Sequence, residues 1–248
     1  MNFRVHRLEE VPSTNTYLRR LAAEKDAVPD GWLVVARRQT AGRGRMGRKW
    51  VAPEGAVLCF SFFVRAEVPP ETAPSAGMAA ALAVDDFLRE EGLPSRPKWP
   101  NDVLVGGRKI CGILCERAGN GLVIGIGLNV NLTPEQAAEI DRPATSILIE
   151  TGRRLPLEEA LDRLLPFLSR RIDAWREGGF AAIREEWTKR AGPPGRMVEV
   201  RINDHVERGV LAGFGSHGEL LLKTNGEVRT VWSGEIPLSP EPVPEAES

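Results

Sequence analysis

Residues 101–131 read NDVLVGGRKICGILCERAGNGLVIGIGLNVN, and this stretch decides the fold class. It contains three runs rich in β-forming residues, at 101–105, 108–116 and 121–131. Gly106-Gly107 and Gly119-Asn120 separate these runs, and such short turns are a hairpin signal. Because consecutive hairpins join antiparallel neighbours, the stretch predicts an antiparallel or mixed sheet rather than a doubly wound parallel one.

On the N-terminal side of this stretch, apolar runs alternate with helical patterns. The runs that read as strands are 3–8, 32–36 and 56–64. A helix is expected to begin after the short polar residues 13–16, which are of the types that cap helices. A second helix is expected over 75–91, with Gly92 at its end.

On the C-terminal side, helical patterns run from about 134 to 190, and Pro166 inside one of them should kink or break that helix. Gly192-Pro193-Pro194-Gly195 is the clearest linker in the chain. Four or five short strands between 197 and 232 are typical of a small β-barrel. We therefore predict an α+β fold with three parts: a mixed or antiparallel sheet flanked by helices over 1–192, the barrel over 193–238, and a disordered Pro- and Glu-rich tail over 239–248.

The composition narrows the class of protein. Of the 248 residues, 33 are basic and 34 acidic, and the net charge of −1 argues against bulk electrostatic binding to nucleic acid or to an anionic membrane. No stretch approaches the roughly 18 apolar residues of a membrane span, and the N-terminus has no apolar signal region. Cys59, Cys111 and Cys115 do not suggest a disulfide framework. We therefore expect a cytoplasmic protein whose cysteines are small buried core residues.

The basic loop over residues 42–50, GRGRMGRKW, is the first candidate for chemistry. Arginine offers a planar fork of donors to carboxylate or phosphate, and glycine lets backbone N–H groups approach an anion. No Gly-Lys-Ser/Thr is present, and no helix opens at its end, so it is neither a Walker loop nor a dinucleotide fingerprint. We expect a flexible anion-binding loop; taken alone, it fits a solvated loop or an RGG-like nucleic-acid segment equally well.

Polar residues next to two of the expected strands form the second candidate group. The segment 98–103, KWPNDV, carries an Asn-Asp pair that could ligate Mg²⁺ or bond a ribose or an ammonium, although a capped turn explains it as well. Asn129 is polar within an apolar run, and strand-end hydrogen bonding is the alternative explanation. Gly112, Gly125 and Gly127 lie inside strands, where glycine often marks the close approach of a ligand.

The order of these motifs is more specific than any one of them. Ser13-Thr14-Asn15, Gln39 with GRGRMGRKW, KWPNDV, RK-x-x-G at 108–112 and GxGxNxN at 125–131 resemble the biotin protein ligases (biotin–[acetyl-CoA-carboxylase] ligases). The resemblance covers about residues 10–190, the catalytic domain of that family. It extends to Gly213, Gly218 and Ser233-Gly234-Glu235, which are similar to the family's small SH3-like C-terminal module.

The resemblance implies an ATP-dependent ligase that forms biotinyl-5′-AMP and transfers biotin to a lysine of a biotin carboxyl carrier protein, with ATP and Mg²⁺ as co-substrates. It implies catalytic roles for Arg45 and Lys109. Biotin-binding roles are implied for Ser13, Thr14, Asn15, Gln39, Arg43, Gly44, Arg45, Lys109 and Gly112. Roles in binding ATP or the adenylate are implied for Gly42, Arg43, Arg45, Trp50, Asn101, Asp102 and Asn129, with Asp102 also the candidate metal ligand.

The chain departs from the family pattern in two places. Met46 stands where relatives often have arginine, which removes one charge from the basic loop. Only twelve residues precede Ser13, too few for the winged helix of bifunctional members, so we expect the monofunctional type with neither a DNA partner nor repressor activity. Relatives commonly pair their sheets, which implies a homodimer. The alternatives are a lipoate–protein ligase or octanoyl transferase of the same fold, or an RGG-like nucleic-acid-binding protein.

Overall fold

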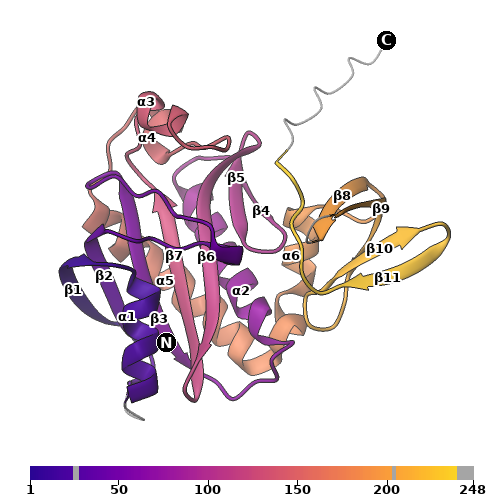
Figure 1. Ribbon diagram of the computed structural model, residues 1–248, viewed down its shortest axis with the longest axis horizontal. Helices are drawn as coiled ribbons and strands as arrows, with labels where there is room; N and C mark the ends of the chain where they lie inside the picture. Colours follow the sequence, from indigo (N-terminus) through magenta and orange to yellow (C-terminus); the bar gives the residue numbers. More distant parts are fainter. Residues whose placement is uncertain (25–27, 203–204, 239–248) are drawn as a thin grey trace.

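The computed structural model describes residues 1–24, 28–202 and 205–238, and a seven-stranded sheet forms its centre (Figure 1). The order across the sheet is β1-β2-β3-β7-β6-β5-β4. β1 and β2 are parallel, and every other neighbouring pair is antiparallel, so the predicted mixed sheet is confirmed. The strands are β1 (Arg4–Val11), β2 (Trp32–Gln39), β3 (Val57–Arg65), β4 (Ser95–Lys98), β5 (Asp102–Val105), β6 (Arg108–Ala118) and β7 (Gly121–Asn129).

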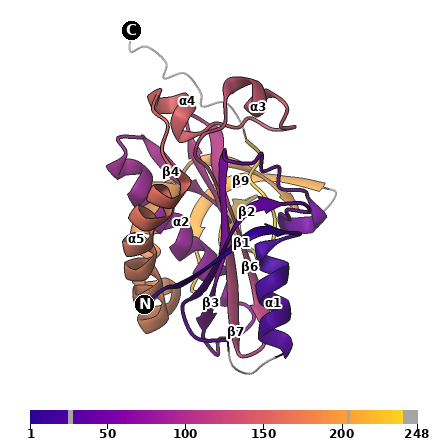
Figure 2. The ribbon, with the colours of Figure 1, turned by 90° about the vertical axis from the view of Figure 1, so that its left-hand side faces the viewer.

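Helices cover both faces of this sheet, as the view in Figure 2 shows. α2 and α5 pack on each other over one face, and α1 lies on the other face against β3, β6 and β7. α6 contacts β4 and the small second sheet. The helices are α1 (Thr14–Glu24), α2 (Ala73–Glu90), α3 (Pro134–Ala138), α4 (Ile147–Thr151), α5 (Leu157–Gly178) and α6 (Arg184–Ala191). None of the helices in the described ranges is long and apolar enough to cross a membrane.

The central strand β7 is buried along its whole length, on both faces of the sheet. Side chains alternate between the two faces of a strand. Ile124 and Ile126 therefore join the core beneath α2 and α5, whereas Val123 packs beneath α1. The next positions on the α1 face are Gly125 and Gly127, which have no side chains, and here the sheet leaves room for the cavity described below.

Pro166, predicted to kink or break a helix, does not break it, because α5 runs through all 22 of its residues as one helix. A proline inside a helix removes one backbone hydrogen bond and costs about 3 kcal/mol. The apolar face of α5 offsets this cost, since it is buried against α2 along several turns. Its fully or almost fully buried side chains are Ala160, Leu161, Leu164, Leu168, Ile172 and Trp175.

A small antiparallel sheet, with the strand order β11-β10-β9-β8, follows the Gly192–Gly195 linker, as expected (Figure 1). The turn between β9 and β10 attaches it to the rest of the molecule: the indole of Trp99 donates a hydrogen bond to the carbonyl of Gly218, at 3.1 Å. The strands are β8 (Met197–Ile202), β9 (His205–Phe214), β10 (Leu220–Thr224) and β11 (Glu227–Val231). The tail predicted over 239–248 lies outside the described residues.

One strand of the central sheet was absent from the sequence-based prediction. Residues 95–98 form β4, which pairs with β5 at the edge of the sheet. The run is only four residues long and contains Pro97, and proline is confined to edge positions of a sheet because it cannot donate to the ladder. β4 matters for the site because it ends at Lys98.

Candidate functional site

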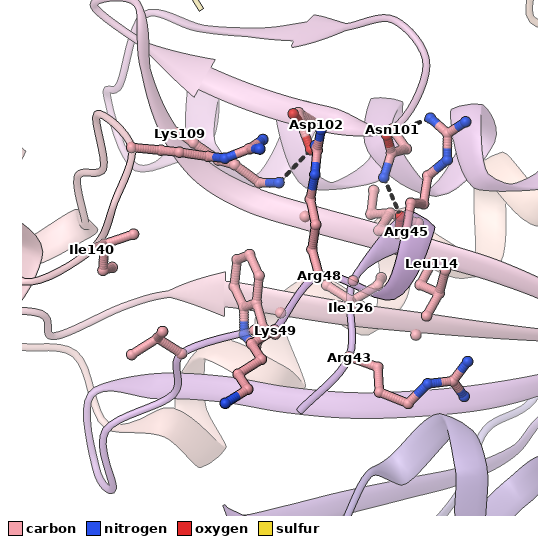
Figure 3. Close-up of a pocket in the computed structure, with 18 of the residues that line it drawn as sticks. Arg43, Arg45, Arg48, Lys49, Asn101, Asp102, Lys109, Leu114, Ile126 and Ile140 are labelled. Carbon is pink, nitrogen blue, oxygen red and sulfur yellow. Dashed lines mark hydrogen bonds and ion pairs between the residues drawn. The ribbon is translucent and has the colours of Figure 1, made fainter. Parts of the chain in front are cut away.

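A cavity of about 460 Å³ lies between the start of α1, the centre of the sheet and three loops (Figure 3). The basic loop forms one wall together with Val51, the loop 139–144 forms a second, and residues 234–235 beyond the small sheet form a third. Every predicted site residue except Gly42 lines this cavity: Ser13, Thr14, Asn15, Gln39, Arg43, Gly44, Arg45, Trp50, Asn101, Asp102, Lys109, Gly112 and Asn129. Tertiary packing therefore brings together motifs that are spread over more than 100 residues of sequence.

The basic loop, which the sequence predicts to be flexible, closes on itself as a small hairpin. Arg43 and Lys49 form an antiparallel bridge around the 3₁₀ turn η1 (Arg45–Gly47). Gly42 holds the base of this hairpin, because its carbonyl accepts a hydrogen bond from the backbone N–H of Trp50 at 2.9 Å. Met46 at the tip has a positive φ of 56° and is 62% exposed.

The first end of the cavity is a network of uncharged polar groups. The side-chain carbonyl of Gln39 accepts hydrogen bonds from the backbone N–H of Thr14 at 2.8 Å and from its hydroxyl at 3.1 Å. Ser61 lies 2.7 Å from the Thr14 hydroxyl and donates to Asn15 at 2.6 Å. Sequence analysis missed Ser61. Its position as a hydroxyl residue within the apolar run 56–64 was a signal that could have identified it. The network positions donors and acceptors where α1 begins.

The floor of the cavity is made of glycines that other side chains cover. A Cβ atom at Gly127 would overlap the Trp50 indole, and one at Gly125 would overlap the Asn15 side chain. At Gly112 a Cβ would lie 2.9 Å from the Trp50 ring and 3.0 Å from the Lys109 side chain. The close approach expected at these glycines is therefore made by Trp50 and Asn15, so the glycines position the site's own side chains.

The second end of the cavity is cationic and centres on Asp102. This buried carboxylate lies 2.5 Å from the ammonium of Lys109 through Oδ1 and 3.2 Å from that of Lys98 through Oδ2. Burial by itself would raise the pKa of Asp102, but the two lysines outweigh it and hold that pKa below its usual value. Lys109 also lies 5.3 Å from the centroid of the Trp50 ring, within the range of a cation–π contact.

The two arginines of the Arg-Gly-Arg segment lie in different surroundings (Figure 3). Arg45 donates to Asn101 Oδ1 at 3.2 Å, and burial lowers the pKa of its guanidinium. Arg43 points away from Asp102 and instead donates to Thr16 at 3.1 Å and to Glu116 at 3.2 Å. Arg45 is therefore placed beside the cationic end, whereas Arg43 is held at the margin.

Three charged residues that pair with one another in the cavity wall had no role in the sequence-based prediction. Glu235 accepts from Arg142 at 2.8 Å and pairs with Arg48 at 2.6 Å, so it links the basic loop, the loop 139–144 and the chain beyond β11. Arg48 and Glu235 belong to motifs that the sequence analysis quoted, but Arg142 carries no local signal. Both arginines line the cavity and add to its positive charge.

Asn129 offers an unpaired acceptor inside the site. Its amide nitrogen donates to the carbonyls of Thr145 at 3.0 Å and of Lys109 at 3.4 Å. Its oxygen Oδ1 is buried and has no hydrogen-bond partner within the described part of the chain. Since both partners of the nitrogen are carbonyls, the amide orientation is settled, and the oxygen is free to accept a donor from a ligand.

The arrangement does not fit the prediction that Asp102 binds a metal ion. Both of its oxygens are engaged by ammonium groups, and the described residues include no group of three or more His, Cys, Asp or Glu side chains that could hold a metal. The cysteines are free thiols, as expected, and burial raises the pKa of Cys59 to about 12.

Comparison with known proteins agrees with this geometry. Residues 8–132 match the model of the biotin/lipoate A/B protein ligase family. The chain is 35% identical over 245 residues to the biotin–[acetyl-CoA-carboxylase] ligase of Paracoccus denitrificans, covering 92% of this chain and 98% of the relative. It is 34% identical over 217 residues to the bifunctional ligase/repressor BirA of Bacillus subtilis, covering 85% and 67%.

The fold is similar to that of a solved structure of the same class. The biotin protein ligase from Aquifex aeolicus in complex with biotin and ATP superimposes with a TM-score of 0.80 at 32% sequence identity, covering 96% of this chain and 99% of that one. The sequence match, the shared fold and the polar and cationic ends of the cavity agree with one another. The chain therefore belongs to the biotin/lipoate A/B protein ligase family and, within it, to the biotin protein ligases.

Proposed function

We propose that this cavity joins biotin to ATP as biotinyl-5′-AMP and then passes biotin to a lysine of a biotin carboxyl carrier protein. The observation that carries the proposal is the polarity of the cavity, with uncharged hydrogen-bonding groups at one end and cationic groups at the other. Biotin has the matching shape, since an uncharged ureido ring and a carboxylate are separated by an aliphatic chain. The relatives named above act as biotin ligases, which supports the same assignment here.

The ureido ring is assigned to the Thr14–Gln39–Asn15 end of the cavity, where buried hydrogen-bonding groups fix the orientation of a ligand. The aliphatic chain then runs over Leu114 and the glycine floor, where few polar groups would need to be desolvated. This orientation brings the carboxylate to Arg45 and Lys109, as the family resemblance implies. Ser13, Gly44 and Gly112 line the same path.

The nucleotide is assigned to the space between Trp50, the loop 139–144 and Glu235. The indole of Trp50 offers a stacking surface for adenine, and the free acceptor of Asn129 suits the adenine amino group. Arg48 and Arg142 face the same space and suit the phosphates. Mg²⁺ enters this proposal only as part of the MgATP substrate, because no described carboxylate cluster fits it.

The chemistry requires two anions to meet. A biotin carboxylate oxygen attacks the α-phosphorus of ATP, the bond to the bridging oxygen breaks, and pyrophosphate leaves. Arg45 and Lys109 reduce the repulsion between carboxylate and phosphate, and they stabilise the charge that grows on the α-phosphate. Because the carboxylate is already a nucleophile, no Ser/His/Asp triad is needed. In the second step the acceptor amine attacks the acyl carbon, a proton is lost, and AMP leaves.

The proposal is tested by measuring pyrophosphate release from ATP with biotin as the only carboxylic acid substrate added. Purified protein with ATP and Mg²⁺ should release pyrophosphate when biotin is added and should retain biotinyl-5′-AMP, which mass spectrometry of the denatured complex would detect. Lipoate is the matched comparison, because a lipoate ligase shares the fold. Release that depends on lipoate but not on biotin would favour that alternative, and no release with either acid would refute the proposed chemistry.

Further properties implied by the family are proposed with it. We propose that the small C-terminal sheet, together with the backbone bridge between Arg201 and Glu235, is the family's SH3-like barrel, and that the domain boundary lies at residues 192–193. A homodimer, a cytoplasmic location and the lack of repressor activity remain predictions. Sedimentation velocity of the purified chain, with and without biotin and ATP, would test the homodimer.

A further inference from the structure

Lys98 opens the KWPND segment, and the proposed reaction leaves it without a role. Its side chain is only 3% exposed, at the point where β4 ends. The ammonium donates to the carbonyl of Ile236 at 2.8 Å, and it lies 3.2 Å from Asp102 Oδ2 and 4.0 Å from Glu235 Oε1. An ammonium is rarely buried unless anions surround it, because its desolvation costs several kcal/mol. This cost indicates that Lys98 has a function at this position.

We propose that Lys98 is a positioning residue for adenylate formation: it holds the Asp102 carboxylate so that Asp102 in turn holds the Lys109 ammonium at the cationic end of the cavity. The inference rests on the proposed function and adds a residue to it. Lys98 does not line the cavity, whereas Asp102 and Lys109 do, so Lys98 acts through its neighbours.

The division of the Asp102 oxygens between two lysines carries this inference. Oδ2 faces Lys98 and Oδ1 faces Lys109, so the carboxylate cannot turn both oxygens toward Lys109. Without Lys98, Oδ2 would lose its ionic partner in a buried site, and Asp102 would be free to rotate and draw the Lys109 ammonium toward itself. The ammonium would then be less available to a carboxylate or phosphate in the cavity.

The net charge of the cluster also indicates that Lys98 supports adenylate formation. Lys98, Asp102 and Lys109 together carry one net positive charge, and removal of Lys98 leaves a neutral Asp102–Lys109 pair at the place where two anions must meet. Burial lowers the pKa of Lys98, while Asp102 and Glu235 oppose that shift, so its charge depends on these two carboxylates. Arg45 also interacts electrostatically with Asp102 and Glu235, so these two carboxylates stabilise the charges of both Lys98 and Arg45.

Lys98 also joins this end of the cavity to the chain beyond the small sheet. Its bond to Ile236 lies beside Gly234, whose carbonyl accepts from Arg45 at 3.4 Å, and beside Glu235, which binds Arg48. The segment 234–236 is in turn bridged to β8 through the backbone of Arg201. Loss of Lys98 should therefore loosen one contact of this segment without removing the others.

The test compares Lys98→Met, which keeps the length of the side chain but removes its charge, with the exposed control Lys189→Met. With excess biotin carboxyl carrier protein present to consume the adenylate, we expect Lys98→Met to lower the kcat of biotin-dependent pyrophosphate release about tenfold, within the coupling found for residues of one ion-pair network. The KM for biotin should change less than kcat does, because the hydrogen-bonding groups at the ureido end of the cavity are unchanged. Lys189→Met should retain wild-type kinetics.

A second comparison covers the possibility that the single variant folds poorly. Asp102→Asn removes the group through which Lys98 acts, and the double variant with Lys98→Met leaves no charge at either of these two buried positions, whereas Lys109 keeps its charge at the cavity wall. If Lys98 acts through Asp102, the double variant and Asp102→Asn should have the same kcat within about twofold. Thermal unfolding would confirm that the compared proteins are folded.

Three results would overturn the inference. The first is a folded Lys98→Met protein whose kcat is within twofold of wild type. The second is a further drop of about tenfold on the Asp102→Asn background, which would show an independent role. The third is an increase in the biotin KM that matches the fall in kcat, which would indicate general damage to the cavity. Wild-type protein in the same assay tests the proposed function separately, since absence of its activity would refute that function itself.

Discussion

Substituting Gly127 by alanine should separate nucleotide binding from biotin binding. A Cβ atom at this position would overlap the indole of Trp50, so the ring must leave the floor of the cavity. Gly125 lies two residues earlier on the same face of β7, and there a Cβ would overlap the Asn15 side chain at the other end of the cavity. The two substitutions add the same single methyl group to the same strand, but they displace different side chains.

The expected changes in stability and in the two KM values follow from these contacts. Overpacking a rigid site costs about 1–3 kcal/mol of stability, so both proteins should remain folded with lower melting temperatures. Loss of an aromatic stacking contact with adenine is worth about 0.5–1.5 kcal/mol, which is about 2- to 13-fold in affinity. Gly127→Ala should therefore raise the KM for ATP by this factor and leave the KM for biotin nearly unchanged. Gly125→Ala should do the reverse.

Initial rates of pyrophosphate release in the presence of excess biotin carboxyl carrier protein, with biotin or ATP varied at saturating levels of the other, would measure both KM values. Gly77→Ala in α2 is the matched control, because a Cβ there would lie 3.5 Å from Cys115, an ordinary contact, and alanine favours a helix. It should leave both KM values unchanged. An unchanged ATP KM in Gly127→Ala, or the same KM raised in both β7 variants, would refute the assignment of Trp50 to the nucleotide end.

Three further predictions concern charge and backbone. Arg45→Ala and Lys109→Ala should each lower the kcat of adenylate formation by an amount equivalent to about 2–4 kcal/mol while circular dichroism stays native, and unchanged pyrophosphate release would contradict their assigned roles. The pKa of Asp102 is depressed in the folded protein, so its ion pairs stabilise the fold above the ordinary value of 3.8, and this stability is lost as the pH falls through the lower folded-state pKa. Urea unfolding between pH 7 and pH 2 should therefore show a steeper acid loss in wild type than in Asp102→Asn, and parallel losses would count against this ion pairing. Pro166→Ala should restore a backbone hydrogen bond inside α5 and raise the free energy of unfolding by up to about 3 kcal/mol, whereas a lower melting temperature would show that the proline fits its site.

The hairpins β5–β6 and β6–β7 were predictable because each depends on a turn of two residues and the apolar runs beside it. Neighbours in sequence decide such turns, so a single chain is enough to recognise them. β4 escaped prediction because a four-residue edge strand with a proline has no such local pattern. The continuity of α5 at Pro166 also escaped it, since burial against α2 offsets the local penalty only in the folded molecule.

In the candidate site, too, some features could be predicted from neighbouring residues and others depend on tertiary packing. Residues of the basic loop and of KWPND could be picked out as candidates because their types and order are unusual in a short stretch. The pairing of Asp102 with two lysines could not be predicted, because an Asn-Asp pair looks the same in sequence whether a metal ion or two lysines face it. Arg142 and Glu235 meet across 93 positions of the chain, and no local pattern signals that contact.

By itself, the sequence determined the class of fold, the order of most strands and helices, and many of the polar residues that line the cavity, because turn residues, periodicity and motif order are properties of neighbouring positions. Only the tertiary structure decided which charges pair, which side chains cover the glycines of β7, and how the chain beyond the small sheet reaches the cavity. Those outcomes depend on distances between segments far apart in sequence. Packing of the whole core sets these distances, and the free energy of each ion pair or contact follows from them.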